Sequence, residues 1–166
     1  MTLWRFAATF FYLGKLPIAP GTWGSLGALI LWLFLPVTTS VHLSVILILF
    51  LLGLFSSHIV AKYMQVHDPS EVVIDEAVGM GISLFMLPHN FGLYFIAFIL
   101  FRFFDILKPS FIYQIQKLPG GWGIMLDDVL AGLFTLVIVS GISALLCLVD
   151  LSSVNLALGS IPAAMH

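Results

Sequence analysis

Charge is what this sequence has least of. Of its 166 residues only 8% are charged, whereas 61% are hydrophobic and the mean hydropathy is +1.15. Soluble domains carry about 25% charged residues, so the composition excludes an ordinary soluble domain and predicts a polytopic membrane protein. The net charge of −2 is too small to indicate a nucleic-acid partner. The length suits one domain, residues 1–166.

Cysteine is nearly absent as well. The single cysteine, Cys147, excludes an intramolecular disulfide and a CxxC metal site. It lies in an apolar run, and we expect it to be an inert packing residue. A cleavable signal peptide is not expected either, because the first apolar stretch is short and Lys15, Pro17 and Pro20 follow it in place of small residues.

Five apolar segments are present, at 21–37, 41–57, 72–87, 91–104 and 124–149. Crossing the hydrocarbon takes about 20 residues, so the last segment is long enough and the second nearly so. Residues 1–14 favour an interfacial amphipathic helix leading into a loop up to residue 20, with core packing as an equal alternative. Residues 150–166 form a tail. We predict an all-α helical bundle with four or five membrane-embedded helices.

The basic residues alternate between connections. Lys and Arg precede the first segment, lie between the second and third, and lie between the fourth and fifth, whereas 38–41, 88–90 and the chain after 149 have none. This asymmetry predicts five crossings with a cytoplasmic N-terminus. Every acidic residue except Asp150 then lies at or near a cytoplasmic helix end.

The acidic residues are concentrated in or beside apolar stretches. A carboxylate at a bilayer centre costs roughly 2.5–3.5 kcal/mol on insertion scales, so this placement indicates a site. The acids form four groups: Asp68 with Glu71, Asp75 with Glu76, Asp105, and Asp127 with Asp128.

Simple ion pairing does not account for all these charges. Arg102 and Asp105 are three residues apart and share a helical face, and Lys108 follows one turn later. Two cations would still face five acids, which repel or take up protons unless metal ions share the site. Oxygen ligands without clustered His or Cys favour Mg²⁺ or Mn²⁺ over zinc. The five acids are Asp75, Glu76, Asp105, Asp127 and Asp128.

Two further groups are weaker candidates. Lys15, Thr22 and Ser25 lie in a Gly/Pro segment before the first apolar run, near a helix N-terminus that favours phosphate. A plain loop leading into the membrane is equally compatible with that segment. His67 beside Asp68 suggests a ligand or acid–base group, although a lone loop histidine is more often structural.

Four motifs occur in order along the chain: Pro17-x-x-Pro20-Gly21-Thr22-x-Gly24-Ser25; His67-Asp68 with Ile74-Asp75-Glu76-x-x-Gly79; Phe101-Arg102-x-x-Asp105-x-x-Lys108-Pro109; and Gly120-Gly121-x-Gly123-Ile124-Met125-x-Asp127-Asp128-x-x-Ala131-Gly132. Together, from about residue 13 to 135, they resemble one family, bacterial phosphatidylglycerophosphatase A. One departure is Phe111, where the family pattern has a second proline after Pro109.

The resemblance implies a Mg²⁺-dependent lipid phosphatase of the bacterial cytoplasmic (inner) membrane, with its active site on the cytoplasmic side. Such a hydrolase converts the membrane phospholipid phosphatidylglycerophosphate to phosphatidylglycerol in phospholipid biosynthesis. Nothing in the sequence indicates an obligate protein partner. Direct water attack and an aspartyl-phosphate intermediate both stay open, as does the choice of general base.

The resemblance also assigns roles to the polar residues. The five acids would hold one or two Mg²⁺ ions and act in catalysis. Arg102 and Lys108 would bind the substrate phosphate, with Lys15, Thr22 and Ser25 as weaker candidates and His67 and Asp68 as possible support. The alternative is a small divalent-cation transporter or channel subunit that uses the same carboxylates. Permeation needs polar residues on both sides of the membrane, and here the distal half of each segment lacks acids and bases.

Overall fold

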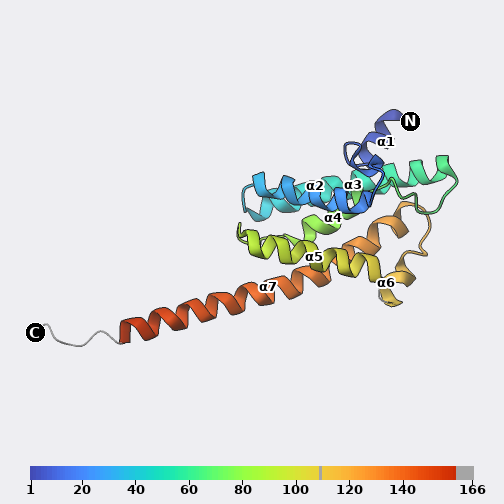
Figure 1. The fold of residues 1–166 in the computed structure, drawn as a ribbon. Helices are drawn as coiled ribbons and strands as arrows, with labels where there is room; N and C mark the ends of the chain where they lie inside the picture. Colours follow the sequence, from blue (N-terminus) through green and yellow to red (C-terminus); the bar gives the residue numbers. More distant parts are fainter. Residues whose placement is uncertain (109, 160–166) are drawn as a thin grey trace, which may run out of the picture.

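The protein is built from helices, as predicted (Figure 1). The structure, a computed structural model, describes residues 1–108 and 110–159, without the side chains of 110, 111, 113 and 150–159. Pro109, the side chains of Phe111 and Asp150, and residues 160–166 of the predicted tail therefore lie outside the described part. The elements are α1 (Thr2–Ala8), the 3₁₀ helix η1 (Leu13–Lys15), α2 (Pro20–Phe34), α3 (Thr39–Met64), α4 (Ile74–Ser83), α5 (Phe91–Leu107), α6 (Ser110–Ile115) and α7 (Gly121–Gly159).

Helix α4 lies at the centre of the bundle and contacts α2, α3, α5 and α7. Its ten residues span about 15 Å at 1.5 Å per residue, roughly half of a hydrocarbon core. Gly79 lets α7 approach closely, because a Cβ there would lie 2.6 Å from the Asp128 carbonyl oxygen. The short central helix is therefore packed backbone to backbone against the part of α7 that carries Asp128.

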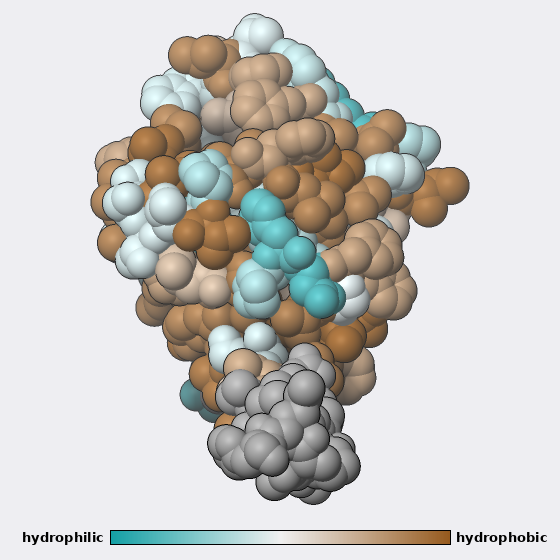
Figure 2. Space-filling view, turned by 90° about the vertical axis from the view of Figure 1, so that its left-hand side faces the viewer, coloured by the Kyte–Doolittle hydropathy of each residue, from teal (hydrophilic) through white to brown (hydrophobic). Residues whose placement is uncertain are grey.

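Two helices among the described residues are long and apolar enough to cross a membrane, Thr39–Met64 and Gly121–Val149. Only 22% and 17% of their most apolar windows are buried in the structure. A soluble protein would bury such helices in its core, so these surfaces suit contact with lipid. Figure 2 shows an end of the molecule that is mostly hydrophobic, with a small hydrophilic strip. Helix α7 also continues to residue 159, beyond its predicted end at 149.

The N-terminal helix is shorter than expected. The sequence favoured a helix over residues 1–14, but α1 ends at Ala8 and the chain turns through Phe10, Phe11 and Tyr12, all at positive φ. The turn brings α1 against the loop before α4. There the Val73 N–H donates to the Ala8 carbonyl oxygen at 2.9 Å.

Candidate active site

Three carboxylates meet where α4 begins. Asp75 and Glu76 lie in the first turn of α4, where the helix dipole favours negative charge, and Asp128 reaches them from α7. One oxygen from each of the three residues lies within 4.8 Å of the others. Asp75 and Asp128 are only 7% and 2% exposed. The predicted clustering of distant acids therefore holds for these three.

Each of these three acids has an oxygen without a partner. Asp75 Oδ1, Glu76 Oε2 and Asp128 Oδ2 are buried and accept no hydrogen bond within the part of the chain that the structure describes. Burying an uncompensated carboxylate costs several kcal/mol per ion. Three convergent carboxylate oxygens are ligands that a hard divalent cation such as Mg²⁺ prefers. The residues present therefore fit the metal that the sequence predicts.

Crowding also shifts the acids of α4 toward their neutral forms. Burial raises the pKa of Glu76 to about 7, and the charge of Asp105 adds to the rise while Arg102 opposes it. The pKa of Asp75 is raised well above its usual value, first by burial and then by the charges of Glu76 and Asp128. Without a cation, the cluster is therefore inclined to hold protons near neutral pH.

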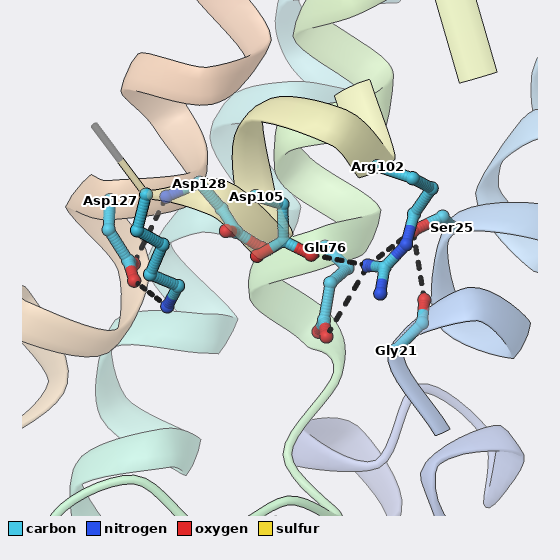
Figure 3. A network of polar contacts seen from close by, with 8 residues as sticks. Gly21, Ser25, Glu76, Arg102, Asp105, Asp127 and Asp128 are labelled. Carbon is cyan, nitrogen blue, oxygen red and sulfur yellow. Dashed lines mark hydrogen bonds and ion pairs between the residues drawn. The ribbon is translucent and has the colours of Figure 1, made fainter. Parts of the chain in front are cut away.

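Arg102 connects three helices beside the cluster (Figure 3). Its Nη1 atom, reaching out from α5, lies 2.5 Å from Asp105 Oδ2 and 4.0 Å from Glu76 Oε1. The same group donates to Ser25 Oγ of α2 at 3.4 Å, and Ser25 in turn donates to the Gly21 carbonyl oxygen at 2.8 Å. Ser25 thus contacts Arg102, which the sequence had placed among the phosphate-binding residues.

The adjacent acids of α7 have different partners. Lys108 Nζ lies 2.6 Å from Asp127 Oδ2, and the Asp128 N–H donates to Asp127 Oδ1 at 3.0 Å. Burial disfavours the charged amine, but the nearby charge of Asp127 outweighs it and raises the pKa of Lys108. Asp127 is therefore neutralised by a lysine, whereas Asp128 faces Asp105 and the α4 acids (Figure 3).

Comparison with known proteins identifies the family that these residues belong to. The sequence pattern of the family described as phosphatidylglycerophosphatase A matches residues 6–143. The chain belongs to this family. The resemblance seen in the sequence is thereby confirmed.

Relatives of known name agree with this assignment. A phosphatidylglycerophosphatase A from Haemophilus influenzae is 43% identical over 133 residues, covering 78% of this chain and 82% of the relative. One of the same name from Escherichia coli is 39% identical over 137 residues, covering 80% and 78%. A putative phosphatidylinositol-3-phosphatase from Bacteroides thetaiotaomicron is 38% identical over 137 residues, covering 76% and 85%. No solved structure matches the chain.

The weaker candidates Lys15, Thr22, His67 and Asp68 are not part of the three-acid cluster. Asp68 is exposed and accepts a hydrogen bond from Gln116 Nε2 at 3.0 Å, and its charge contributes to the raised pKa of Asp75. In the described residues no hydrogen bond or ion pair joins Lys15, Thr22 or His67 to the acids. Lys15 instead lies over the Tyr12 ring, with Nζ 4.8 Å from the ring centroid.

Sequence reasoning missed the role of Gly21. A Cβ at this position would collide with Glu76 Oε1, so the first turn of α2 lies directly against the Glu76 carboxylate. The glycine occurs in the first motif, but only the structure shows what it contacts. Gln116, the partner of Asp68, carried no signal in the sequence.

Proposed function

We propose that this chain is a Mg²⁺-dependent lipid phosphatase that hydrolyses phosphatidylglycerophosphate to phosphatidylglycerol. Membership of the family makes the chain a phosphatase. The observation that carries the metal dependence is the set of unpartnered oxygens on Asp75, Glu76 and Asp128. Family membership and the shared name of two relatives support the substrate. The comparisons give no support to a cation transporter.

The three clustered acids would hold the metal. When bound there, Mg²⁺ supplies Lewis-acid polarisation of phosphoryl oxygens and neutralises charge on the phosphate monoester. Asp75 and Glu76 approach from α4 and Asp128 from α7, so the site depends on the close packing of these two helices. Asp105 and Asp127 were also expected to be ligands. Their short contacts with Arg102 and Lys108 favour a different task.

Arg102 and Lys108 would bind the phosphate oxygens. Hydrolysis forms a bond from phosphorus to a water oxygen and breaks the bond from phosphorus to the glycerol oxygen, so negative charge builds on the oxygens. Fixed cations stabilise that charge without reorganising during the reaction. We propose that Asp105 holds Arg102 and Asp127 holds Lys108 in position.

We further propose that four or five helices are embedded in the bacterial cytoplasmic membrane, with the site on its cytoplasmic side. The acids support this placement, since they lie at the start of α4 and near the start of α7, close to Lys108. Cysteines introduced at position 62 in a Cys147→Ser background should react with an impermeant thiol reagent only from the cytoplasm. Reaction of position 62 in intact cells would reverse the orientation.

Substrate choice is tested by phosphate release from purified protein. We expect phosphatidylglycerophosphate to be hydrolysed with a higher kcat/KM than phosphatidate or lysophosphatidate under the same conditions. The relative named for phosphatidylinositol 3-phosphate makes that lipid a useful competitor. Equal or faster hydrolysis of any of these lipids would refute the proposed specificity.

A further inference from the structure

An apolar cavity of about 310 Å³ lies between α1 with its following turn, α3 and α4. All of its lining side chains are hydrophobic or aromatic. They include Trp4, Ala7, Phe11, Leu49, Leu52 and Ile74. We refer to this cavity as the α1 groove.

The α1 groove adjoins the helix end that carries the acids. Ile74 lines the groove and is the first residue of α4, and Asp75 and Glu76 follow it directly. Ile74 is only 1% exposed, so the first turn of α4 is buried beneath the groove. Because successive residues of a helix point about 100° apart, Asp75 lies on the face next to the groove, whereas Glu76 lies on the far side of the same turn, against Gly21 and Arg102.

The α1 wall of the groove is fixed in place. A helix of seven residues is too short to be stable by itself, but Arg5 binds both carboxylate oxygens of Glu71 at 2.9 and 3.0 Å. The Arg5 Nε group adds a third hydrogen bond at 3.1 Å. Together with the bond from Val73 to Ala8, this ion pair ties α1 to the loop that leads into α4.

We propose that the α1 groove binds an acyl chain of the lipid whose phosphate lies at the acid cluster. The inference rests on the proposed function and adds a binding site for the apolar part of the substrate. Asp75 follows Ile74 directly, so a lipid whose phosphate is bound at the acid cluster can extend one chain past Ile74 into the groove. The groove at that point offers only apolar surface, which excludes the headgroup and accepts hydrocarbon. The occupant is the substrate, not a lipid of the surrounding bilayer.

Filling the groove tests the proposal. Ala7→Trp places a large side chain in the groove, and Ala144→Trp places the same side chain on an exposed part of α7 as a matched control. Phosphate release is measured in mixed micelles from phosphatidylglycerophosphate with two oleoyl or two hexanoyl chains. We expect Ala7→Trp to raise KM at least about tenfold for the oleoyl lipid, with kcat and hexanoyl-lipid hydrolysis unchanged. Ala144→Trp should leave kcat and KM unchanged for both lipids.

Two results would overturn the acyl site. One is an unchanged KM for the oleoyl lipid in Ala7→Trp. The other is an equal loss of kcat on both lipids, which would show that the groove is only structural. If the wild type hydrolyses the hexanoyl lipid, the proposed phosphatase function holds whatever the result for the groove. If it hydrolyses neither lipid, the proposed function itself fails.

A second readout needs no activity. Trp4 lines the groove, so the fluorescence lost in Trp4→Phe reports on its occupant. Phosphatidylglycerophosphate with brominated chains, at a few mole per cent in phosphatidylcholine vesicles, should quench Trp4 well beyond its share of the lipid. Brominated phosphatidylcholine at the same fraction serves as the control. Equal quenching by the two brominated lipids would show that bulk lipid fills the groove and would refute the proposal. This readout does not depend on whether the protein hydrolyses phosphatidylglycerophosphate.

Discussion

Lys108 Nζ lies 2.6 Å from Asp127 Oδ2, while the neighbouring Asp128 keeps a buried oxygen without a partner in the described residues. Two acids adjacent in sequence thus differ in their surroundings as well as in direction. One is compensated by a lysine, and the other contributes uncompensated charge to the cluster with Asp75 and Glu76. A cation would satisfy the second without disturbing the first.

Removing the uncompensated charge should separate activity from stability. We expect Asp128→Asn to lower kcat at least about 100-fold, a loss of roughly 2.7 kcal/mol of transition-state stabilisation. In EDTA the same variant should unfold at a higher temperature than the wild type, because asparagine removes a buried acid that must otherwise repel Asp75 and Glu76 or take up a proton. Mg²⁺ should raise the unfolding temperature of the wild type but not that of Asp128→Asn. Thermal unfolding in detergent measures both effects, and a less stable variant in EDTA would contradict the role given to Asp128.

The Lys108–Asp127 pair should behave as a unit. Asp127→Asn removes the positioning partner of Lys108, so we expect lower kcat but a preserved rise in unfolding temperature with Mg²⁺. Lys108→Met should lower kcat as well, and the double variant should lose much less than the sum of the two single free-energy changes. Additive losses, or loss of the Mg²⁺ effect in Asp127→Asn, would instead favour Asp127 as a metal ligand.

Stability without metal should fall as pH rises. Burial raises the pKa of Glu76 from its ordinary value of 4.5 to about 7 in the folded protein. Between about pH 4.5 and 7 the folded state therefore binds more protons than the unfolded state. Unfolding free energy therefore decreases as pH increases from about 4.5 through 7, by at most about 3 kcal/mol for this group. Unfolding temperatures in EDTA at pH 5 to 8 measure the trend, which should weaken in Glu76→Gln. Mg²⁺ should restore stability at pH 8, and a wild-type protein that is more stable in EDTA at pH 8 than at pH 5 would contradict this.

Gly21 should be required for activity because there is no room for a larger side chain beside Glu76. A Cβ there would strike Glu76 Oε1, so Gly21→Ala should displace that carboxylate and lower kcat about tenfold or more. Gly141→Ala is the matched control, because a Cβ at 141 meets nothing within 4 Å and alanine favours a helix. Phosphate release from both variants provides the comparison. Equal activity of the two would show that α2 does not constrain Glu76.

The sequence was sufficient for the class of fold and for part of the site. Apolar segments mark α2, α3, α5 and α7 because lipid contact requires long hydrophobic surfaces, and they mark α4 because it is buried among those helices. The acids stand out because they are costly in such surroundings. It could not separate Asp127 from Asp128, since that difference depends on which helix each side chain faces.

The N-terminal turn shows the same limit. Residues 10–13 continue the aromatic and apolar pattern beyond Ala8, and the local turn contact there, from the Tyr12 N–H to Thr9 Oγ1, could not be foreseen. The end is set by distant contacts: Val73 binds the Ala8 carbonyl oxygen, and Gly14 packs against the Glu71 carbonyl oxygen. Such tertiary contacts override local helix preference, which is why the α1 groove was not predictable from the sequence.

Phosphate release from phosphatidylglycerophosphate in EDTA, then with added Mg²⁺, tests most directly whether the three-acid cluster of Asp75, Glu76 and Asp128 is a metal-dependent catalytic site. We expect chelation to abolish release and Mg²⁺ to restore it, with Ca²⁺ restoring little because its coordination is larger and looser. Cys147→Ser should keep the same dependence and serves as the control. Full activity of the wild type in EDTA would contradict the metal site directly.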